Sequence, residues 1–293
     1  IMKVIKNDSI SNINKNRDFY DKKYKGVNVS GLIKTLNNLD SFLNDATTTD
    51  ISWVGMYVNN FKDTINGKKI MELGCGNCAN VSVMAALGAE VVANDISDYS
   101  GDIINALNSN YKFQHDITFV KGDFTKHNLL NQSLDMVIGK AFLHHLTLEH
   151  ELQVIKKISQ VLKPDGEARF FEPAVNSKFL DELRWAVPMN NRPSKLLNPK
   201  AFKQWEESDP HPHRDNSSKH FERLGYQFFN NIEIIPMGML ERFYRILPFS
   251  TKTIRKYRRA TLKLEKHAPK FIQYFGARSQ TIIYKRPKST SHV

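Results

Sequence analysis

The sequence predicts an α/β fold organised around one doubly wound, mostly parallel sheet. Between residues 68 and 172, short apolar stretches of strand length alternate with longer stretches that have helical spacing. The apolar stretches place hydrophobic residues at consecutive positions, as strands covered on both faces do. A glycine-rich turn follows the first of them. In such folds the crossovers are right-handed and ligands bind at the carboxyl ends of the strands.

The predicted elements follow one another at short intervals. Two helices are expected first, at 31–43 and 53–61. Strands are then expected at 69–73, 90–94, 117–120, 134–139 and 168–172, and helices at 79–87, 100–110 and 148–162. A helix at 217–224, closed by Gly225, and two last strands at 228–235 and 279–284 complete the sheet.

This order divides the chain into four parts. Residues 1–66 are expected to form an N-terminal helical cap, and 67–173 the ligand-binding core. Five prolines between 188 and 212 interrupt the alternation, so 174–216 is interpreted as an inserted segment of short helices and loops that acts as a lid. The remainder, 217–293, ends the sheet and carries basic amphipathic helices.

Composition and cysteine use restrict the class of protein. A chain of 293 residues with 41% hydrophobic residues suits one large α/β domain. It contains no apolar run of about 18 residues, and its polar first residues lack a signal-peptide core, so neither a spanning helix nor export is predicted. The two cysteines, Cys75 and Cys78, lie in the glycine turn without a second Cys/His cluster. We therefore expect reduced thiols and a cytoplasmic protein.

The positive charge lies at one end of the chain. Residues 239–293 hold fourteen Lys or Arg against two Glu, which equals the whole net charge of +12. Leu240, Phe243, Tyr244 and Leu247 form one apolar helical face in the basic stretch 239–275. Such a helix can rest on an anionic membrane, line the entrance for an anionic substrate, or pack on the sheet with its charges in water. All three interpretations stay open at this point.

The inserted segment contains a second feature of interest. Asp209-Pro-His211-Pro-His213 offers metal-binding side chains, but two histidines two positions apart without a clear third ligand form a weak motif. The sequence therefore predicts no metal site. Trp185 and Trp205 are expected either to line the substrate pocket or to belong to the ordinary core.

The glycine turn at 74–76 indicates a nucleotide-like ligand. Gly74-x-Gly76-x-x-Ala79, with Asp95 about 20 residues later, fits the dinucleotide fingerprint. Glu72 counts against a pyrophosphate, because it places a carboxylate two residues before the first glycine. Asp123, between Gly122 and Phe124, adds another acid beside an aromatic ring after the third strand. A ligand with an ammonium group and no phosphate suits these acids better.

Together these motifs resemble the class I S-adenosylmethionine-dependent methyltransferases, in their small-molecule branch. The resemblance rests on Glu72-Leu-Gly-Cys-Gly76, on Asp95, on Gly122-Asp123, and on Leu134–Gly139 followed by His144-His145-Leu146 and Leu162-Lys-Pro-Asp-Gly166. It implies a Rossmann-like sheet of seven strands, the last antiparallel and inserted beside the sixth. It also implies S-adenosylmethionine as cofactor.

The resemblance assigns the expected site. The cofactor-binding residues would be Tyr24, Glu72, Gly74, Cys75, Gly76, Asn94, Asp95, Ile96, Gly122, Asp123, Phe124 and Lys140. The catalytic residues would be His144, His145 and Glu172. Lys140-Ala141 stands where many relatives carry a small polar pair, so the contact to the methionine part of the cofactor is left open.

The expected function is methyl transfer to oxygen or nitrogen of a small-molecule or lipid-linked acceptor, with a histidine or an acid as a general base. Nucleic acid is disfavoured as a partner despite the charge. The fourth strand is followed by Gly139-Lys140-Ala141-Phe142 rather than by Asn or Asp and Pro-Pro-aromatic, and both cysteines lie away from that strand. A nicotinamide-dependent oxidoreductase and a non-catalytic binding module of the same fold are the alternatives.

Overall fold

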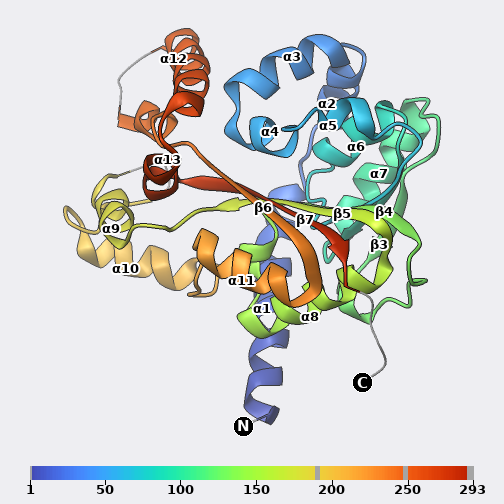
Figure 1. Ribbon diagram of the computed structural model, residues 1–293, viewed down its shortest axis with the longest axis horizontal. Helices are drawn as coiled ribbons and strands as arrows, with labels where there is room; N and C mark the ends of the chain where they lie inside the picture. Colours follow the sequence, from blue (N-terminus) through green and yellow to red (C-terminus); the bar gives the residue numbers. More distant parts are fainter. Residues whose placement is uncertain (1, 189–191, 247–249, 289–293) are drawn as a thin grey trace.

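The computed structural model of the chain describes residues 2–188, 192–246 and 250–288. Within these ranges one seven-stranded sheet runs in the order β3-β2-β1-β4-β5-β7-β6 (Figure 1). The strands are β1 (Lys69–Leu73), β2 (Glu90–Asp95), β3 (Thr118–Lys121), β4 (Leu134–Lys140), β5 (Leu162–Pro173), β6 (Phe229–Met237) and β7 (Ser279–Pro287).

The strand directions confirm the predicted fold class. β1 pairs in parallel with β2 and β4, so that Ile70 lies opposite both Val91 and Met136. β7 is antiparallel to β5 on one side and to β6 on the other. The last strand therefore lies between the fifth and the sixth, as expected. β5 begins earlier than the predicted 168–172, because 162–166 join the ladder through an irregularity in its register with β4.

Helices cover both faces of the sheet. One core cluster joins the sheet to α3 (Leu39–Thr49), α4 (Ile51–Met56), α6 (Ala79–Ala86) and α7 (Asp98–Asn110). The other joins it to α8 (Leu148–Val161) and α11 (Ser218–Phe228). Neighbouring residues of one strand enter opposite clusters, as Ile70 and Met71 of β1 do. This explains why the strands read as continuous apolar runs.

The N-terminal part differs from the expectation. Residues 2–24 form one long helix, α1 (Met2–Tyr24), which the polar sequence did not predict. The helix expected at 31–43 is two helices, α2 (Val29–Leu36) and α3, separated by Asn37 and Asn38. The helix expected at 53–61 is also divided, into α4 and α5 (Phe61–Thr64). Asn28 and Asp50 cap α2 and α4 with their side chains, which fixes these starts.

The inserted and C-terminal parts are helical. The inserted segment holds α9 (Lys178–Ala186) and α10 (Pro199–Ser208), and the basic stretch holds α12 (Thr251–Leu264) and α13 (Lys270–Gly276). Short 3-10 turns are η1 (Phe124–Lys126), η2 (Leu143–His145), η3 (Glu241–Ile246) and η4 (Glu265–His267). Leu247, the last residue of the apolar helical face predicted to begin at Leu240, lies outside the described residues. No helix in the described ranges has the length and apolar content needed to cross a bilayer.

The expected end of α11 at Gly225 is wrong. The helix continues to Phe228, and Gly225 lies against β7. A Cβ atom at this position would come within 2.4 Å of the Tyr284 ring. The glycine is therefore explained by the close approach of helix and strand and not by helix termination.

Candidate active site

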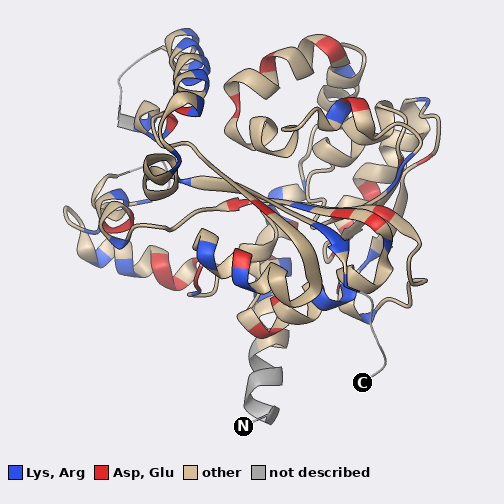
Figure 2. Ribbon diagram, viewed as in Figure 1, with Lys and Arg blue, Asp and Glu red and all other residues tan. Residues whose placement is uncertain are grey.

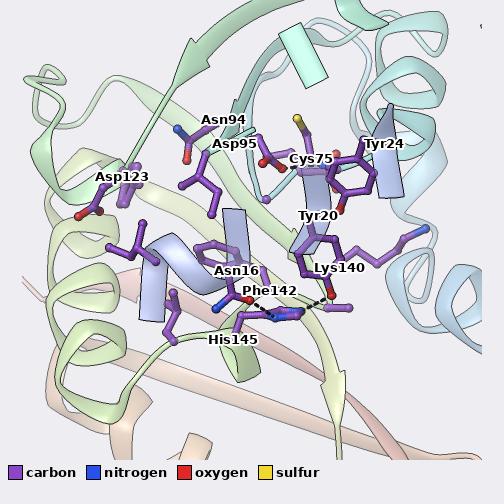
Figure 3. A pocket seen from close by; sticks show the side chains of 18 of the residues that line it. Asn16, Tyr20, Tyr24, Cys75, Asn94, Asp95, Asp123, Lys140, Phe142 and His145 are labelled. Atoms are coloured by element: carbon purple, nitrogen blue, oxygen red, sulfur yellow. Dashed lines mark hydrogen bonds between the residues drawn. The ribbon is translucent and has the colours of Figure 1, made fainter. Parts of the chain in front are cut away.

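A cavity of about 450 Å³ lies at the carboxyl ends of β1, β2 and β4. α1 closes one side of it and the loop after β4 closes another (Figure 3). Every predicted cofactor-binding residue lines this cavity, and so do His144 and His145. The lining also includes residues that the sequence analysis did not assign to the site: Asn12, Ile13, Asn16, Tyr20, Lys23, Val27, Asn77, Asn80, Ala141, Phe142, Leu146, His150 and Val154.

The glycine turn after β1 brings backbone close to the cavity. Gly74 and Gly76 have φ angles of +65° and +55°, which disfavour any residue with a Cβ atom. At Gly76 a Cβ atom would lie 2.7 Å from the Tyr24 hydroxyl oxygen. The turn is held from β2, because the Gly76 amide donates to Asp95 Oδ2 at 2.8 Å. Cys75 and Cys78 are free, buried thiols packed in this turn.

Glu72 is the most buried acid of the cavity wall. Its Oε1 accepts a hydrogen bond from Asn80 Nδ2 at 3.0 Å, but its Oε2 is buried without a hydrogen-bond partner among the described residues. Burial raises the pKa of Glu72 to about 7, although Asn80 and the nearby Lys140 oppose that shift. An unpartnered carboxylate oxygen at a cavity wall is available to accept a hydrogen bond from a bound ligand.

Two further acids stand at the ends of β2 and β3. Asp95 uses both oxygens on backbone amides, those of Gly76 and Ser97, and burial raises its pKa above the ordinary value. Asp123 accepts from His150 Nε2 at 3.1 Å and from the Thr125 amide at 2.9 Å. Burial opposes ionisation of Asp123, but these hydrogen bonds outweigh it and hold its pKa well below the usual range. The three acids expected at strand ends, Glu72, Asp95 and Asp123, therefore line one cavity.

Helix α1 supplies aromatic side chains that the sequence analysis recognised only in part. The rings of Tyr20 and Tyr24 stack with centroids 5.4 Å apart. Burial, with the carboxylates of Asp209 and Asp95 nearby, raises the pKa of Tyr20 to about 12, so its hydroxyl stays protonated. Asp21 accepts a hydrogen bond from the Ser97 hydroxyl and ties α1 to the loop after β2.

Glu172 is placed differently from the expectation. Its carboxylate is buried and accepts hydrogen bonds from the amides of Phe142 and Leu143 at 2.9 and 2.7 Å. The same carboxylate bonds His144 Nδ1 at 2.6 Å. Glu172 is not among the residues that line the cavity, and its contacts hold the loop after β4 and the ring of His144. Its catalytic role stays a prediction from the sequence.

Three histidines meet at the rim of the cavity. His144 and His145 come from η2, and His211 comes from the inserted segment. Their ring centroids are 4.2, 4.3 and 4.9 Å apart. We call this group the histidine cluster. The sequence analysis paired His211 with His213, but His213 does not belong to the cluster, which unites residues more than 60 positions apart.

Polar neighbours fix the rings of the cluster. His145 Nδ1 bonds Asn16 Oδ1 at 2.9 Å, and its Nε2 lies 3.3 Å from the Tyr20 hydroxyl (Figure 3). His211 Nδ1 bonds Asp209. Burial, with His144 and His211 alongside, keeps the pKa of His145 well below the ordinary value, so its ring is neutral.

A buried ion pair holds the inserted segment beside the cluster. Arg214 donates to the backbone oxygens of Leu143 and Leu146 at 2.7 and 2.9 Å and to Glu151 Oε1 at 2.6 Å. Both charged groups are almost fully buried. This contact explains how His211, three residues before Arg214, reaches η2.

Comparison with known proteins identifies the domain. A family model described as "Methyltransferase domain" matches residues 71–170. Sterol 24-C-methyltransferase of Candida albicans is 28% identical over 113 residues, 38% of this chain and 29% of that protein. Cypemycin N-terminal methyltransferase of a Streptomyces species is 28% identical over 120 residues, 40% of this chain and 45% of that protein. The matched stretches thus span less than half the length of either relative.

Among solved structures, one chain of a complex that contains the Haloferax volcanii Trm112 methyltransferase activator matches with a TM-score of 0.51 and 14% identity. The match covers 94% of this chain and 99% of that one, and it concerns the fold alone. The domain match, the strand order and the glycine turn agree with one another. Residues 71–170 therefore form a methyltransferase domain of the class I type, whose cofactor is S-adenosylmethionine.

Proposed function

We propose that the protein transfers the methyl group of S-adenosylmethionine to a small acceptor that enters beside the histidine cluster. The observation that carries this proposal is the position of two rings of the cluster, those of His144 and His145, which line the same cavity as the three acids. When bound, the cofactor supplies a methyl group on a sulfonium, whose sulfur keeps the bonding electron pair as the methyl group leaves. The acceptor atom gains the methyl group and loses its proton.

The cavity wall fits this cofactor in its chemistry. Glu72 Oε2 lacks a hydrogen-bond donor, and an ammonium group would provide one. Gly74 and Gly76 carry no side chain, so the backbone of the turn itself lines the cavity, where Phe142 and Tyr24 approach it closely. We infer that Glu72 holds the amino-acid part, that Asp95 orients the ribose and that Asp123 faces the adenine. These residues would orient the cofactor, and correct orientation of the two reactants lowers the activation free energy of such a transfer substantially.

The acceptor side contains groups that can deal with the acceptor's proton. The cluster presents imidazole nitrogens at the rim, and Glu172 fixes the orientation of His144. A direct base role of His144 or His145 remains the prediction from the sequence. The acceptor atom is not transferred from the relatives, because one is named for carbon methylation and the other for methylation of an N-terminus. We retain oxygen or nitrogen of a small-molecule or lipid-linked acceptor as the proposal.

A lipid-linked acceptor is supported by one surface. α13 exposes Phe271 and Phe275, and α9 exposes Phe179 and Leu183. The two helices are neighbours, because Asn176 just before α9 donates to the backbone oxygen of Tyr274 at 2.8 Å (Figure 1). Lys178 and Lys270 stand exposed at their first positions. Apolar side chains beside lysines are typical of contact with an anionic membrane.

Calorimetry with S-adenosylhomocysteine tests the cofactor site. Asp95→Ala should abolish binding, because Asp95 both lines the cavity and holds the Gly76 amide. Asp116→Ala, at an exposed acid of the same molecule, is the matched control and should bind as the wild type does. Equal affinities of the two variants would contradict the site assignment.

Two outcomes separate the alternative functions. Binding of NADH without binding of S-adenosylhomocysteine would favour an oxidoreductase. Tight binding of S-adenosylhomocysteine, with no methyl transfer from labelled cofactor to any component of small-molecule and lipid extracts, would favour a binding module.

A further inference from the structure

The histidine cluster has a feature that a proton acceptor alone does not require. Each of its three Nδ1 atoms is bonded to a different oxygen, that of Glu172, Asn16 or Asp209. These oxygens come from three separate parts of the chain: β5, α1 and the inserted segment. A carboxylate accepts hydrogen bonds and does not donate them, so His144 and His211 carry their protons on Nδ1.

The same assignment holds for the third ring if Asn16 presents its oxygen, as placed. His145 Nδ1 then donates to Asn16, and its Nε2 is left as the acceptor of the Tyr20 hydroxyl hydrogen bond. In the neutral form of each ring Nε2 carries the lone pair, and that of His145 accepts the Tyr20 hydroxyl. Within the described residues, no hydrogen bond is formed by Nε2 of His144 or of His211.

One ring nitrogen from each histidine lies within 4.8 Å of one from each of the others. Where these nitrogens are the Nε2 atoms, their lone pairs converge, and a cation between them would offset their mutual repulsion. Neutral imidazoles whose second nitrogen is bonded to a carboxylate or an amide oxygen are the usual arrangement around protein-bound zinc. Two adjacent carboxylates, those of Glu172 and Asp209, also offset the charge of a divalent ion.

From this arrangement we propose that the histidine cluster binds one divalent transition-metal ion of the zinc type through Nε2 of His144, His145 and His211. The site requires the three nitrogens to approach to roughly 3.3 Å, which follows from bond lengths of about 2.0–2.1 Å in tetrahedral geometry. Small rotations about the broad χ2 torsion of histidine contribute to that movement, and His145 Nε2 must exchange the Tyr20 hydroxyl for the ion. Arg214 does not oppose the ion at full charge, because Glu151 neutralises it.

The ion would act on the acceptor, and this role rests on the proposed methyl transfer. Three protein nitrogens leave a fourth position open, as in catalytic zinc sites. An acceptor hydroxyl that occupies it would lose its proton to solvent more readily, because the ion stabilises the oxyanion. The oxygen then forms its bond to the methyl carbon while the carbon–sulfur bond breaks and its electron pair stays on sulfur. The inference therefore favours oxygen as the acceptor atom.

Metal binding can be measured without any acceptor. Untagged full-length protein is stripped with a chelator and titrated with Zn²⁺ by calorimetry and with Co²⁺ by visible absorption. We expect one ion per chain, with a dissociation constant of about 1 μM or tighter, and a Co²⁺ spectrum typical of nitrogen ligands. His211→Gln should weaken Zn²⁺ binding at least ~10-fold and abolish the Co²⁺ spectrum. His211 lies on the inserted segment, so this variant leaves the sheet unaltered.

His213→Gln is the matched control, because it removes a histidine two positions away that does not belong to the cluster. It should bind Zn²⁺ as the wild type does. Asp209→Asn should weaken binding by ~10–100-fold through loss of the charge on the Nδ1 partner. Equal Zn²⁺ affinity in wild type, His211→Gln and His213→Gln would overturn the proposal, as would no measurable Zn²⁺ uptake by the wild type.

Titration with S-adenosylhomocysteine on the same samples separates the two proposals. If the nucleoside binds and Zn²⁺ does not, the metal site is refuted and the methyltransferase proposal stands. If Zn²⁺ binds at the cluster and the nucleoside does not, the metal site stands and the proposed methyl transfer loses its basis.

Discussion

Glu72 should make cofactor binding depend on pH. Burial sets its pKa near 7 in the free protein, so the carboxyl group is largely neutral below that pH. A bound ammonium group favours the charged form, so binding releases a proton and affinity rises with pH up to about 7. We expect roughly a tenfold gain per pH unit below the pKa. Glu72→Gln should remove this dependence, whereas Glu90→Gln, at an exposed acid, should keep it. A flat calorimetric profile in the wild type would contradict the assignment.

Alanine substitutions at Gly76 and Gly67 separate two effects, backbone strain at a positive φ and a steric change in the cavity. Both have a positive φ, so alanine at either position should cost about 1–2 kcal/mol of stability in urea denaturation. Only Gly76 has a neighbour that a Cβ atom would strike, the Tyr24 hydroxyl, while Gly67 has nothing within 4 Å. Gly76→Ala should therefore also lose affinity for S-adenosylhomocysteine, and Gly67→Ala should not. The same loss in both variants would show that strain, and not the cavity, is responsible.

Most cavity residues could be predicted from the sequence because they follow strands. Glu72, Asp95 and Asp123 stand at strand ends, where ligands bind in doubly wound sheets. Asn16 and Tyr20 could not be found in this way, because they lie on a polar helix that is far from the strands in sequence. The cluster was missed for a related reason. His211 reaches His144 only through the burial of Arg214 against Glu151, and no local spacing reveals such a contact.

Among the secondary-structure elements, α12 and α13 divide the basic stretch into two different surfaces. Basic residues gather along α12 (Figure 2). Arg255 and Arg259 of this helix pair with Asp45 of α3, and Leu262 is buried. The interpretation of a charged helix packed on the protein therefore fits α12. On α13 the aromatic side chains are exposed, with 73% of Phe271 and 55% of Phe275 accessible. The candidate membrane contact is thus the shorter helix and not the more basic one.

Replacement of both aromatics of α13, as Phe271→Ser with Phe275→Ser, should weaken binding to vesicles that contain anionic phospholipid. Each phenylalanine contributes about 2 kcal/mol when its side chain leaves water, so we expect a loss of at least ~10-fold in a sedimentation assay. Leu130→Ser, at an exposed apolar residue elsewhere, is the control. Wild-type protein that does not sediment with anionic vesicles would refute the membrane contact.

Helix α11 offers a test of how elements contact one another. Gly225→Ala places a methyl group within 2.4 Å of the buried Tyr284 ring, so the helix must move away from β7. We expect a loss of about 1–3 kcal/mol in unfolding free energy, measured by urea denaturation. Gly26→Ala has no atom within 4 Å of its Cβ and should be nearly neutral. An unchanged or higher stability of Gly225→Ala would indicate that the space is less restricted than the contacts indicate.

For the whole molecule, the sheet was predictable and the parts that close the site were not. Consecutive apolar positions in short stretches are sufficient to predict strands covered on both faces, and β1 and α6 begin where expected. The order of the last two strands came from the family resemblance and is confirmed. The helices of the cap were misjudged because breaks at Asn37-Asn38 and at residues 57–60 fall within what looked like continuous periodic segments.

Helix α1 also has a kinetic consequence. It borders the cavity and is held at several places: to Thr147 through Ser9, to the inserted segment through Lys15, to His145 through Asn16, and to the loop after β2 through Asp21. We expect a nucleoside beneath it to leave only when these contacts open, so that release of the spent cofactor limits turnover. Asp21→Ala should speed dissociation of S-adenosylhomocysteine in stopped-flow measurements and, if release limits turnover, raise kcat. The enzyme would then operate in a fixed order, with the nucleoside first to enter and last to leave.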